Sequence, residues 1–198
     1  MDSSAVDLIC EHLLIGVTGS IGAFVVPDYV YKLRKHFARN VHVLMSQSAQ
    51  QFVTPYVLEI FSANPVFTDS FQTSGGIRVP HIELAQRTSL FLIMPATANI
   101  LGKAVSGVCD DLISTMIVAC QAPIVFVPNM NEAMWSDRIV QRNVKLLREV
   151  GYHVVEPTSG VEVSQMISGG CAMPLADALL LSLQVVLATD ADSQDAQA

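Results

Sequence analysis

Short, almost continuous apolar runs alternate with stretches of helical length along this 198-residue chain. Strands buried on both faces produce such runs, and strands that alternate with helices favour a parallel sheet covered on both sides. The predicted strands are residues 13–17, 41–45, 90–94, 124–127 and 153–155. The predicted helical stretches are residues 21–37, 54–61, 99–120 and 136–150. We therefore expect a single α/β domain of three layers with a parallel central sheet.

The composition leans strongly toward apolar residues, which make up 51% of the chain against 15% charged residues. A surplus of this kind belongs either in a membrane or in a subunit interface. The most apolar stretch, residues 175–188, is interrupted by Asp177, Ser182 and Gln184, so it does not match a membrane-spanning helix. We therefore expect a homo-oligomer that does not associate with membranes.

The charge and the cysteines argue against several other classes of protein. The net charge is −7 with no basic cluster, so a nucleic-acid partner is not expected. The four cysteines show neither a CxxC pair nor a zinc-ligand spacing, so no metal site is predicted. No basic flank precedes an apolar run at the N-terminus, as it would in a secretory signal. We expect a cytoplasmic protein with a folded domain over residues 1–188 and an acidic, disordered tail over residues 189–198.

The loops after the first two predicted strands suit a phosphate. Ligands of parallel sheets bind beyond the carboxyl ends of the strands. Gly19, Ser20 and Ile21 lie there, in a small-residue loop that leads into a helix with free N–H groups. Ser46, after the second strand, would add a second donor to the same phosphate. An ordinary turn with serine helix caps would look the same, and the loop favours phosphate only slightly.

The third strand ends in Pro95, Ala96, Thr97, Ala98 and Asn99. The proline fixes the turn, while the threonine and asparagine offer side-chain hydrogen bonds beside small alanines. This pattern suits the edge of a flat ring with a polar rim. A capped loop that enters a helix explains the same residues equally well.

The segment after the fourth strand, residues 128–135, combines apolar and amide side chains. Asn131 could donate from its amide to a carboxylate, and Met130, Met134 and Trp135 could wall an apolar pocket. A hydrophobic staple for the next helix is the alternative. We favour a binding site, because a purely structural cluster would not need the asparagines.

His81 opens the run at residues 82–84 after a glycine-containing loop at residues 73–80. Most isolated histidines are surface or capping residues. A histidine is nevertheless the natural proton acceptor near neutral pH. The other four histidines lie in strand or helix patterns and are assigned no role.

Together these segments resemble the homo-oligomeric flavin-containing cysteine decarboxylases. This family includes phosphopantothenoylcysteine decarboxylase and the peptidyl-cysteine decarboxylases of lantibiotic and thioamitide biosynthesis. The resemblance covers residues 13–187 and implies a flavodoxin-like (Rossmann-type) fold with FMN as the cofactor. It rests on four motifs in the family's order: Gly19-Ser20-Ile21, His81-Ile82-Glu83-Leu84, Pro95-Ala96-Thr97-Ala98-Asn99 for PASANT, and Pro128-Asn129-Met130-Asn131-Glu132-Ala133-Met134-Trp135 for PxMNxxMW.

The resemblance also implies a role for each motif. His81 would be the active-site base, Asn131 the anchor of the substrate carboxylate, and Met134 and Met173 further substrate contacts. Active sites in this family commonly lie between the subunits of a trimer, so a homotrimer or a dodecamer of such trimers is expected. The residues implied in FMN binding are Gly19, Ser20, Ile21 and Ser46 for the phosphate, and Pro95, Ala96, Thr97, Ala98 and Asn99 for the ring.

The chemistry of the family removes a hydride from the β-carbon of cysteine, and the resulting thioaldehyde accepts the electrons released with CO2. Phosphopantothenoylcysteine decarboxylase then reduces the enethiol, with an acidic cysteine in a C-terminal clamp. Aligned on Met173, the acid position here is Gln165, and Cys171 falls where the family has a glycine. We therefore expect oxidative decarboxylation of the C-terminal cysteine of a precursor peptide to an aminoenethiol, in peptide natural-product biosynthesis.

Three alternatives remain open. The chain could be a phosphopantothenoylcysteine decarboxylase of coenzyme A biosynthesis, a flavin prenyltransferase, or a non-catalytic regulatory relative. The motifs around His81 and Asn131 argue against the last two. In addition, Asn129 stands where the family usually has a small residue.

Overall fold

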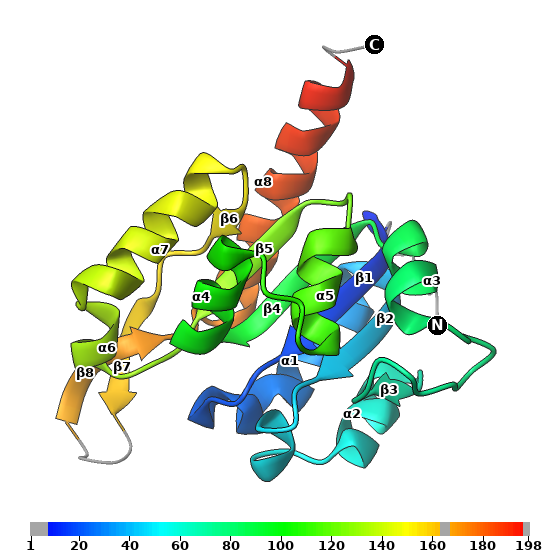
Figure 1. Cartoon of the computed structure of the whole chain (residues 1–198), viewed down its shortest axis with the longest axis horizontal. Coiled ribbons are helices and arrows are strands. Elements are labelled where there is room, and N and C mark those ends of the chain that lie inside the picture. The colour runs from blue at the N-terminus through cyan, green and yellow to red at the C-terminus, as the bar shows by residue number, and fades with distance from the viewer. Residues whose placement is uncertain (1–7, 163–166, 196–198) are drawn as a thin grey trace, which may run out of the picture.

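The computed structural model describes residues 8–162 and 167–195. Six parallel strands form one sheet in the order β3-β2-β1-β4-β5-β6, with helices on both faces (Figure 1). The predicted flavodoxin-like (Rossmann-type) α/β fold with a parallel sheet is confirmed. The strands are β1 (Cys10–Val17), β2 (Ala38–Met45), β3 (Val66–Phe67), β4 (Leu90–Ala96), β5 (Ile124–Pro128) and β6 (His153–Val154).

Two apolar cores form, one on each face of the sheet. Within β1, Leu13 and Ile15 pack into one core and Leu14 into the other, as the two-residue period of a strand requires. The first core is covered by α1 (Val26–His36), α2 (Pro55–Ser62) and α8 (Ala176–Asp195). The second is covered by α3 (Pro80–Arg87), α4 (Ala98–Ser106), α5 (Leu112–Ala119) and α7 (Arg138–Glu149). Short elements complete the chain: the 3₁₀ turns η1 (Ile21–Val25) and η2 (Ala49–Gln51), and α6 (Glu132–Trp135).

The predicted helix over residues 99–120 is two helices. Gly107 ends α4 in the left-handed conformation, with φ at +65°, which glycine adopts readily. Asp111 then begins α5, because its carboxylate accepts the Ser114 N–H at 2.8 Å while the Ser114 hydroxyl accepts the Asp111 N–H at 3.1 Å. This reciprocal cap satisfies N–H groups that the start of a helix leaves free.

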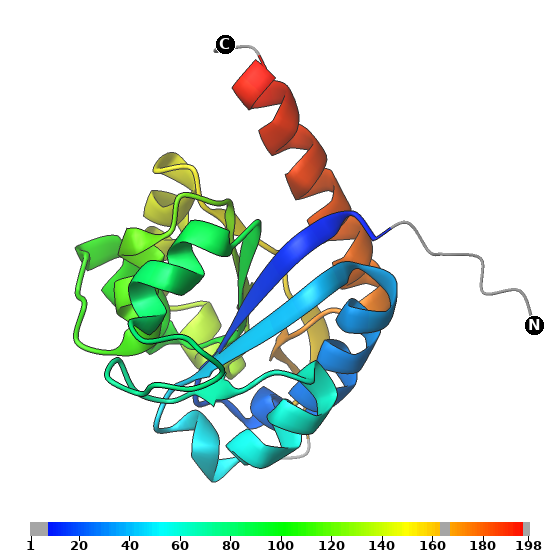
Figure 2. The ribbon, with the colours of Figure 1, turned by 90° about the vertical axis from the view of Figure 1, so that its right-hand side faces the viewer.

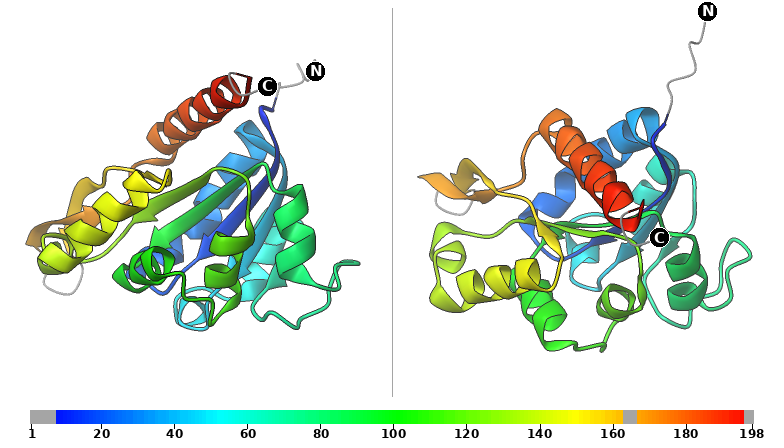
Figure 3. Two further views of the ribbon diagram at one scale, coloured as in Figure 1. Left: turned by 45° about the horizontal axis from the view of Figure 1, so that its top comes forward. Right: turned by 90° about the horizontal axis from the view of Figure 1, so that it is seen from above.

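A β-hairpin near the C-terminus was not foreseen from the sequence. It consists of β7 (Thr158–Glu162) and β8 (Ile167–Ala172), which pair in antiparallel fashion outside the main sheet. Both views of Figure 3 place it at one end of the molecule, beside α6. The glycines at 160, 169 and 170 mask its strand pattern, because glycine is poor in strands. Gln165, the residue aligned with the family's acid, lies outside the described residues.

The C-terminal helix α8 was not among the predicted helical stretches, and it includes residues that we expected to be a disordered tail. α8 continues to Asp195 and extends beyond the sheet, as Figure 2 shows. Residues 189–195 are therefore helical rather than irregular, in keeping with the alanine and the glutamine there that favour helix. Residues 196–198 lie outside the described part. Within the described ranges, no helix is both long and apolar enough to cross a bilayer.

Candidate active site

A pocket of about 480 Å³ opens at the carboxyl ends of β1, β4 and β5, a volume typical of small-ligand sites. It adjoins the point between β1 and β4 where the strand order reverses, which is where doubly wound sheets bind ligands. We call it the main pocket. Its lining combines three strand-end loops with the β7–β8 hairpin: Gly19, Ser20, Ile21, Thr97, Ala98, Asn129, Met130, Asn131, Met134, Val161, Gly169, Gly170, Cys171 and Ala172.

Close packing requires glycine at positions 19 and 22, in the loop after β1. A Cβ on Gly19 would lie 2.3 Å from the Ser48 Oγ, and a Cβ on Gly22 would lie 2.7 Å from the Asn129 Oδ1. Both positions therefore exclude larger side chains. The loop can bring its backbone against a ligand in the main pocket, as a phosphate-binding loop must.

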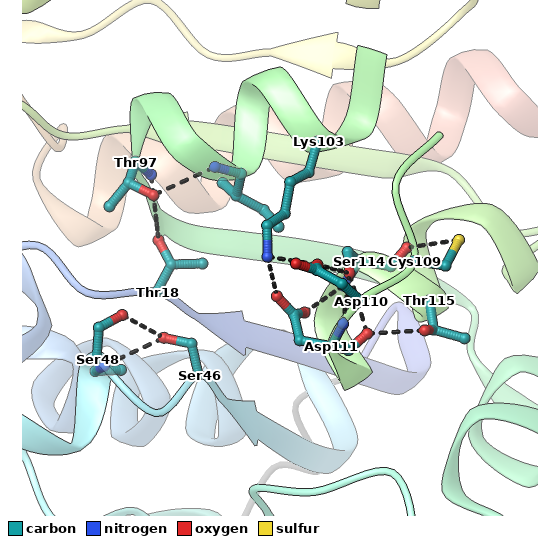
Figure 4. Close-up of polar contacts among 12 residues, drawn as sticks. Thr18, Ser46, Ser48, Thr97, Lys103, Cys109, Asp110, Asp111, Ser114 and Thr115 are labelled. Atoms are coloured by element: carbon teal, nitrogen blue, oxygen red, sulfur yellow. Dashed lines mark hydrogen bonds and ion pairs between the residues drawn. The ribbon is translucent and has the colours of Figure 1, made fainter. Parts of the chain in front are cut away.

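Two threonines join the ends of β1 and β4 (Figure 4). The Thr18 hydroxyl donates to the Pro95 carbonyl at 2.6 Å and accepts the Thr97 N–H at 3.2 Å. The Thr97 hydroxyl in turn accepts the Ile100 N–H at 3.4 Å, which caps α4. Of the five residues predicted to meet the flavin ring, Thr97 and Ala98 line the main pocket. Pro95 and Ala96 belong to β4 and do not line it.

Ser46 and Asn99 line a second, much smaller cavity of about 30 Å³, with Thr97 shared between the two. The Ser46 Oγ accepts the Ala49 N–H at 3.2 Å and lies 3.1 Å from the Ser48 Oγ. The side chain of Ser48 thus contacts both Ser46 and Gly19. A phosphate held jointly by Ser46 and the Gly19 loop stays a prediction.

The acidic turn before α5 is structural. Lys103 Nζ lies 2.6 Å from carboxylate oxygens of both Asp110 and Asp111 (Figure 4). Burial disfavours the charged form of Asp111, but hydrogen bonds from Lys103 and the Ser114 N–H outweigh it and lower the pKa of this carboxyl. The charges of Lys103, Asp110 and Asp111 are thus paired with one another, and Asp111 also caps α5. In the described ranges, no group of three or more His, Cys, Asp or Glu side chains is arranged to hold a metal ion.

Asn131 begins α6, and its side chain leaves one end free for a ligand. Its Oδ1 accepts the Met134 N–H at 2.8 Å. The Nδ2 group can therefore donate to a carboxylate in the main pocket, which both Asn131 and Met134 line. Met173 lies beside Gly22, where a Cβ would come 3.1 Å from the Met173 Cε, and is not among the lining residues.

Cys171 lines the main pocket as a free thiol. Burial raises the pKa of this thiol to about 12, so it stays protonated at neutral pH. Its place in the pocket was not predicted, because the alignment on Met173 put Cys171 where the family has a glycine and not at the position of the acid.

His81 is not brought to the main pocket within one chain. It lies near the start of α3, which Figure 1 places at the opposite end of the sheet from α6 and the hairpin. Its Nδ1 is buried, and no hydrogen-bond partner for it is found among the described residues. The predicted pairing of His81 with Asn131 therefore requires something beyond the single chain.

The sequence profile of the family described as Flavoprotein matches residues 2–183. The chain belongs to the flavoprotein family. A solved structure of the FMN-dependent cysteine decarboxylase SpaF is 33% identical, with a TM-score of 0.75, over 91% of this chain and 97% of that one. The resemblance to flavin-containing cysteine decarboxylases is confirmed, and the family together with its FMN-dependent neighbours supports FMN as the cofactor.

Curated relatives of this flavoprotein have two kinds of name. A probable phosphopantothenoylcysteine decarboxylase of Streptococcus mutans is 33% identical over 83% of this chain and 93% of its own length. Mersacidin decarboxylase of a Bacillus species is 34% identical over 74% of each chain. The bifunctional coenzyme A biosynthesis protein CoaBC of Bacillus subtilis is 35% identical over 76% of this chain, which spans only 37% of that protein.

Proposed function

We propose that this flavoprotein decarboxylates the cysteine carboxylate of phosphopantothenoylcysteine. One observation carries the proposal: Asn131, with a free amide donor, and Cys171, whose buried thiol is protonated, both line the main pocket. An amide donor orients a carboxylate, and a neutral thiol can return a proton after CO2 has left. The relatives from Streptococcus mutans and Bacillus subtilis support this substrate.

The loops of the main pocket fit the cofactor. Gly19 and Gly22 hold the backbone close enough for a phosphate group, and Thr97 and Ala98 supply a small, polar-edged wall. We assign FMN to this surface, where it would supply the redox chemistry that side chains lack. Met134 adds an apolar wall beside the Asn131 amide.

Cys171 changes the argument about the reductive half of the reaction. We expected no acid in the clamp, because Gln165 stands at the aligned position. Cys171 instead reaches the main pocket from β8, in the protonated form that an acid needs. Reduction of the enethiol, as in phosphopantothenoylcysteine decarboxylase, therefore has a candidate proton donor in this chain.

We further propose that a second copy of the chain brings His81 to the main pocket. The His81 side chain as a whole is half-buried, so its exposed part can face a neighbouring subunit, while its Nδ1 is buried. Large apolar side chains are exposed beside the pocket, including Ile21 at 50% on its lining and Phe24 at 59% on the same turn. Tyr56 and Ile60 on α2 are exposed as well. Subunit contact would cover this apolar surface, consistent with a homotrimer or a larger assembly of trimers.

Mass spectrometry of the yellow protein incubated in air with phosphopantothenoylcysteine tests the substrate. A loss of about 44 Da, the mass of CO2, is expected if the enethiol is reduced after decarboxylation. Unchanged phosphopantothenoylcysteine in the presence of bound FMN would overturn the proposed substrate. Protein that does not retain FMN at all would overturn the proposed site.

Decarboxylation of a peptide C-terminal cysteine is the second candidate. The similarity to mersacidin decarboxylase and the glutamine at position 165 favour it. A peptide that ends in cysteine would then lose about 46 Da, because CO2 and two hydrogens leave and no reduction follows. A precursor peptide would be the partner in that case, and the same incubation separates the two candidates.

A further inference from the structure

Asn129 uses both ends of its side-chain amide to connect two walls of the main pocket. Its Oδ1 accepts the Ser20 hydroxyl and also the Gly22 N–H, the latter at 3.2 Å. Its Nδ2 donates to the Cys171 carbonyl at 3.0 Å. One side chain after β5 thus holds the loop that follows β1 and the strand β8, which lie far apart in the sequence.

The hairpin depends on a small number of such bonds. β7 and β8 form a two-stranded sheet of their own, and they meet the rest of the chain at Cys171, which forms a bridge with Met130 through hydrogen bonds of 3.1 and 3.2 Å. Glu132 Oε2 accepts the Gly170 N–H at 3.1 Å beside this bridge. The Asn129 amide is the contact that extends this attachment across the pocket to the opposite loop.

The Asn129 side chain packs against Gly22 and leaves no room for a side chain there. A Cβ at this position would come 2.7 Å from the Asn129 Oδ1, closer than Cβ atoms are found to approach other atoms. Glycine at 22 and asparagine at 129 therefore form a fitted pair. A small residue at 129 would leave the Ser20 hydroxyl, the Gly22 N–H and the Cys171 carbonyl without this partner.

We propose that Asn129 is a positioning residue that sets the separation between the loop after β1 and the strand β8, and thereby the width of the main pocket. Its amide carries no titrating proton, so it acts on binding and not on proton transfer. Only the expected effect on KM rests on the proposed function. The structural consequence holds whatever the substrate is.

Hydrogen exchange of the protein without substrate tests the structural part. In Asn129→Ala, peptides that cover residues 18–25 and 167–173 should exchange about fivefold faster, as loss of one net hydrogen bond predicts. Asn129→Asp keeps the acceptor for Ser20 and Gly22 but loses the donor to Cys171. It should therefore speed exchange at residues 167–173 and leave residues 18–25 unchanged.

Asn40→Ala is the matched control, because it removes an asparagine bonded to the Glu11 carbonyl at 3.3 Å, in the N-terminal half of β2. It should leave both peptides as they are in the natural protein. Unchanged exchange in Asn129→Ala, or an increase spread evenly over the whole chain, would overturn the proposal.

Kinetics separate positioning from chemistry. With the substrate that the protein turns over, Asn129→Ala should raise KM about tenfold and leave kcat and its pH profile unchanged. A fall in kcat with KM unchanged would contradict the assignment. If no substrate is turned over, the proposed function fails, and the exchange experiment still decides the role of Asn129.

Discussion

Asn131 and Cys171 line the main pocket and have different roles in the proposed reaction. Asn131 uses its oxygen to begin α6 and keeps its nitrogen for the ligand. Cys171 is kept neutral because burial raises the pKa of its thiol to about 12. Neither side chain changes its charge near neutral pH, so neither gives the reaction a pH dependence there.

Cys171→Ser should convert the reaction from a net decarboxylation into an oxidative one. The hydroxyl is a much weaker acid than the thiol, so the enethiol should accumulate. Mass spectrometry in air should then show a loss of about 46 Da in place of about 44 Da from phosphopantothenoylcysteine. Cys109→Ser, at an exposed thiol in the turn after α4, is the control and should behave like the natural protein. A loss of about 44 Da in both variants would exclude Cys171 as the acid.

Caps at the helix ends, as well as apolar packing, hold the elements around the site in place. α4 begins with Thr97, whose hydroxyl also belongs to the link between β1 and β4. It ends at Gly107, and α5 begins at Asp111 four residues later. Helix caps therefore hold the strand-end loops in place on this side of the sheet.

Gly102 within α4 and Gly107 at its C-terminal cap should respond in opposite ways to alanine. Gly107→Ala should lower the free energy of unfolding by about 1 kcal/mol, because alanine disfavours the left-handed conformation found there. Gly102→Ala should leave the stability unchanged or raise it by up to about 1 kcal/mol, because the new Cβ meets only Asn143 Nδ2 at 3.7 Å. Urea unfolding followed by circular dichroism measures both. Equal effects would show that backbone conformation is not the cause.

Lys103→Met should destabilise the protein at neutral pH and matter less in acid. The pKa of Asp111 is lowered in the folded state, so its contribution is complete above the ordinary pKa of 3.8 and is lost as the pH falls through the lowered value. We expect a deficit of about 1 kcal/mol at pH 7 in urea unfolding, a small figure because these groups are partly exposed, and a smaller deficit near pH 3. A deficit that is the same at both pH values would mean that packing of the lysine, not its charge, is responsible.

The single chain assembles the main pocket but leaves His81 apart from it. Asn131, Met134 and Cys171 line the pocket, whereas His81 lies on α3 at the other end of the sheet. Exposed apolar side chains beside the pocket provide a surface for a second copy. A complete site therefore belongs, in our proposal, to the assembly and not to one subunit.

Mixed assemblies should reveal a shared site. His81→Asn and Asn131→Ala should each be inactive alone. If His81 acts on the pocket of a neighbouring subunit, refolding the two variants together in equal amounts should restore about a quarter of the activity, because random mixing pairs two natural residues at that fraction of sites. Mixing each variant with itself is the control. No recovery in mixed assemblies of the natural size would place both residues in one chain.

Local patterns determined the framework of this protein. The apolar runs identified five of the six strands of the sheet, because burial on both faces leaves a continuous apolar segment that needs no distant context. The strand-end motifs placed Gly19, Thr97 and Asn131 at one edge for the same reason, since parallel strands end together. The tertiary structure decided what depends on distant contacts. Asn129 bonds to Ser20, 109 residues away, and to Cys171, 42 residues away, and such pairs are set by packing and not by local sequence. The hairpin that carries Cys171 and the separation of His81 from the pocket were decided in the same way.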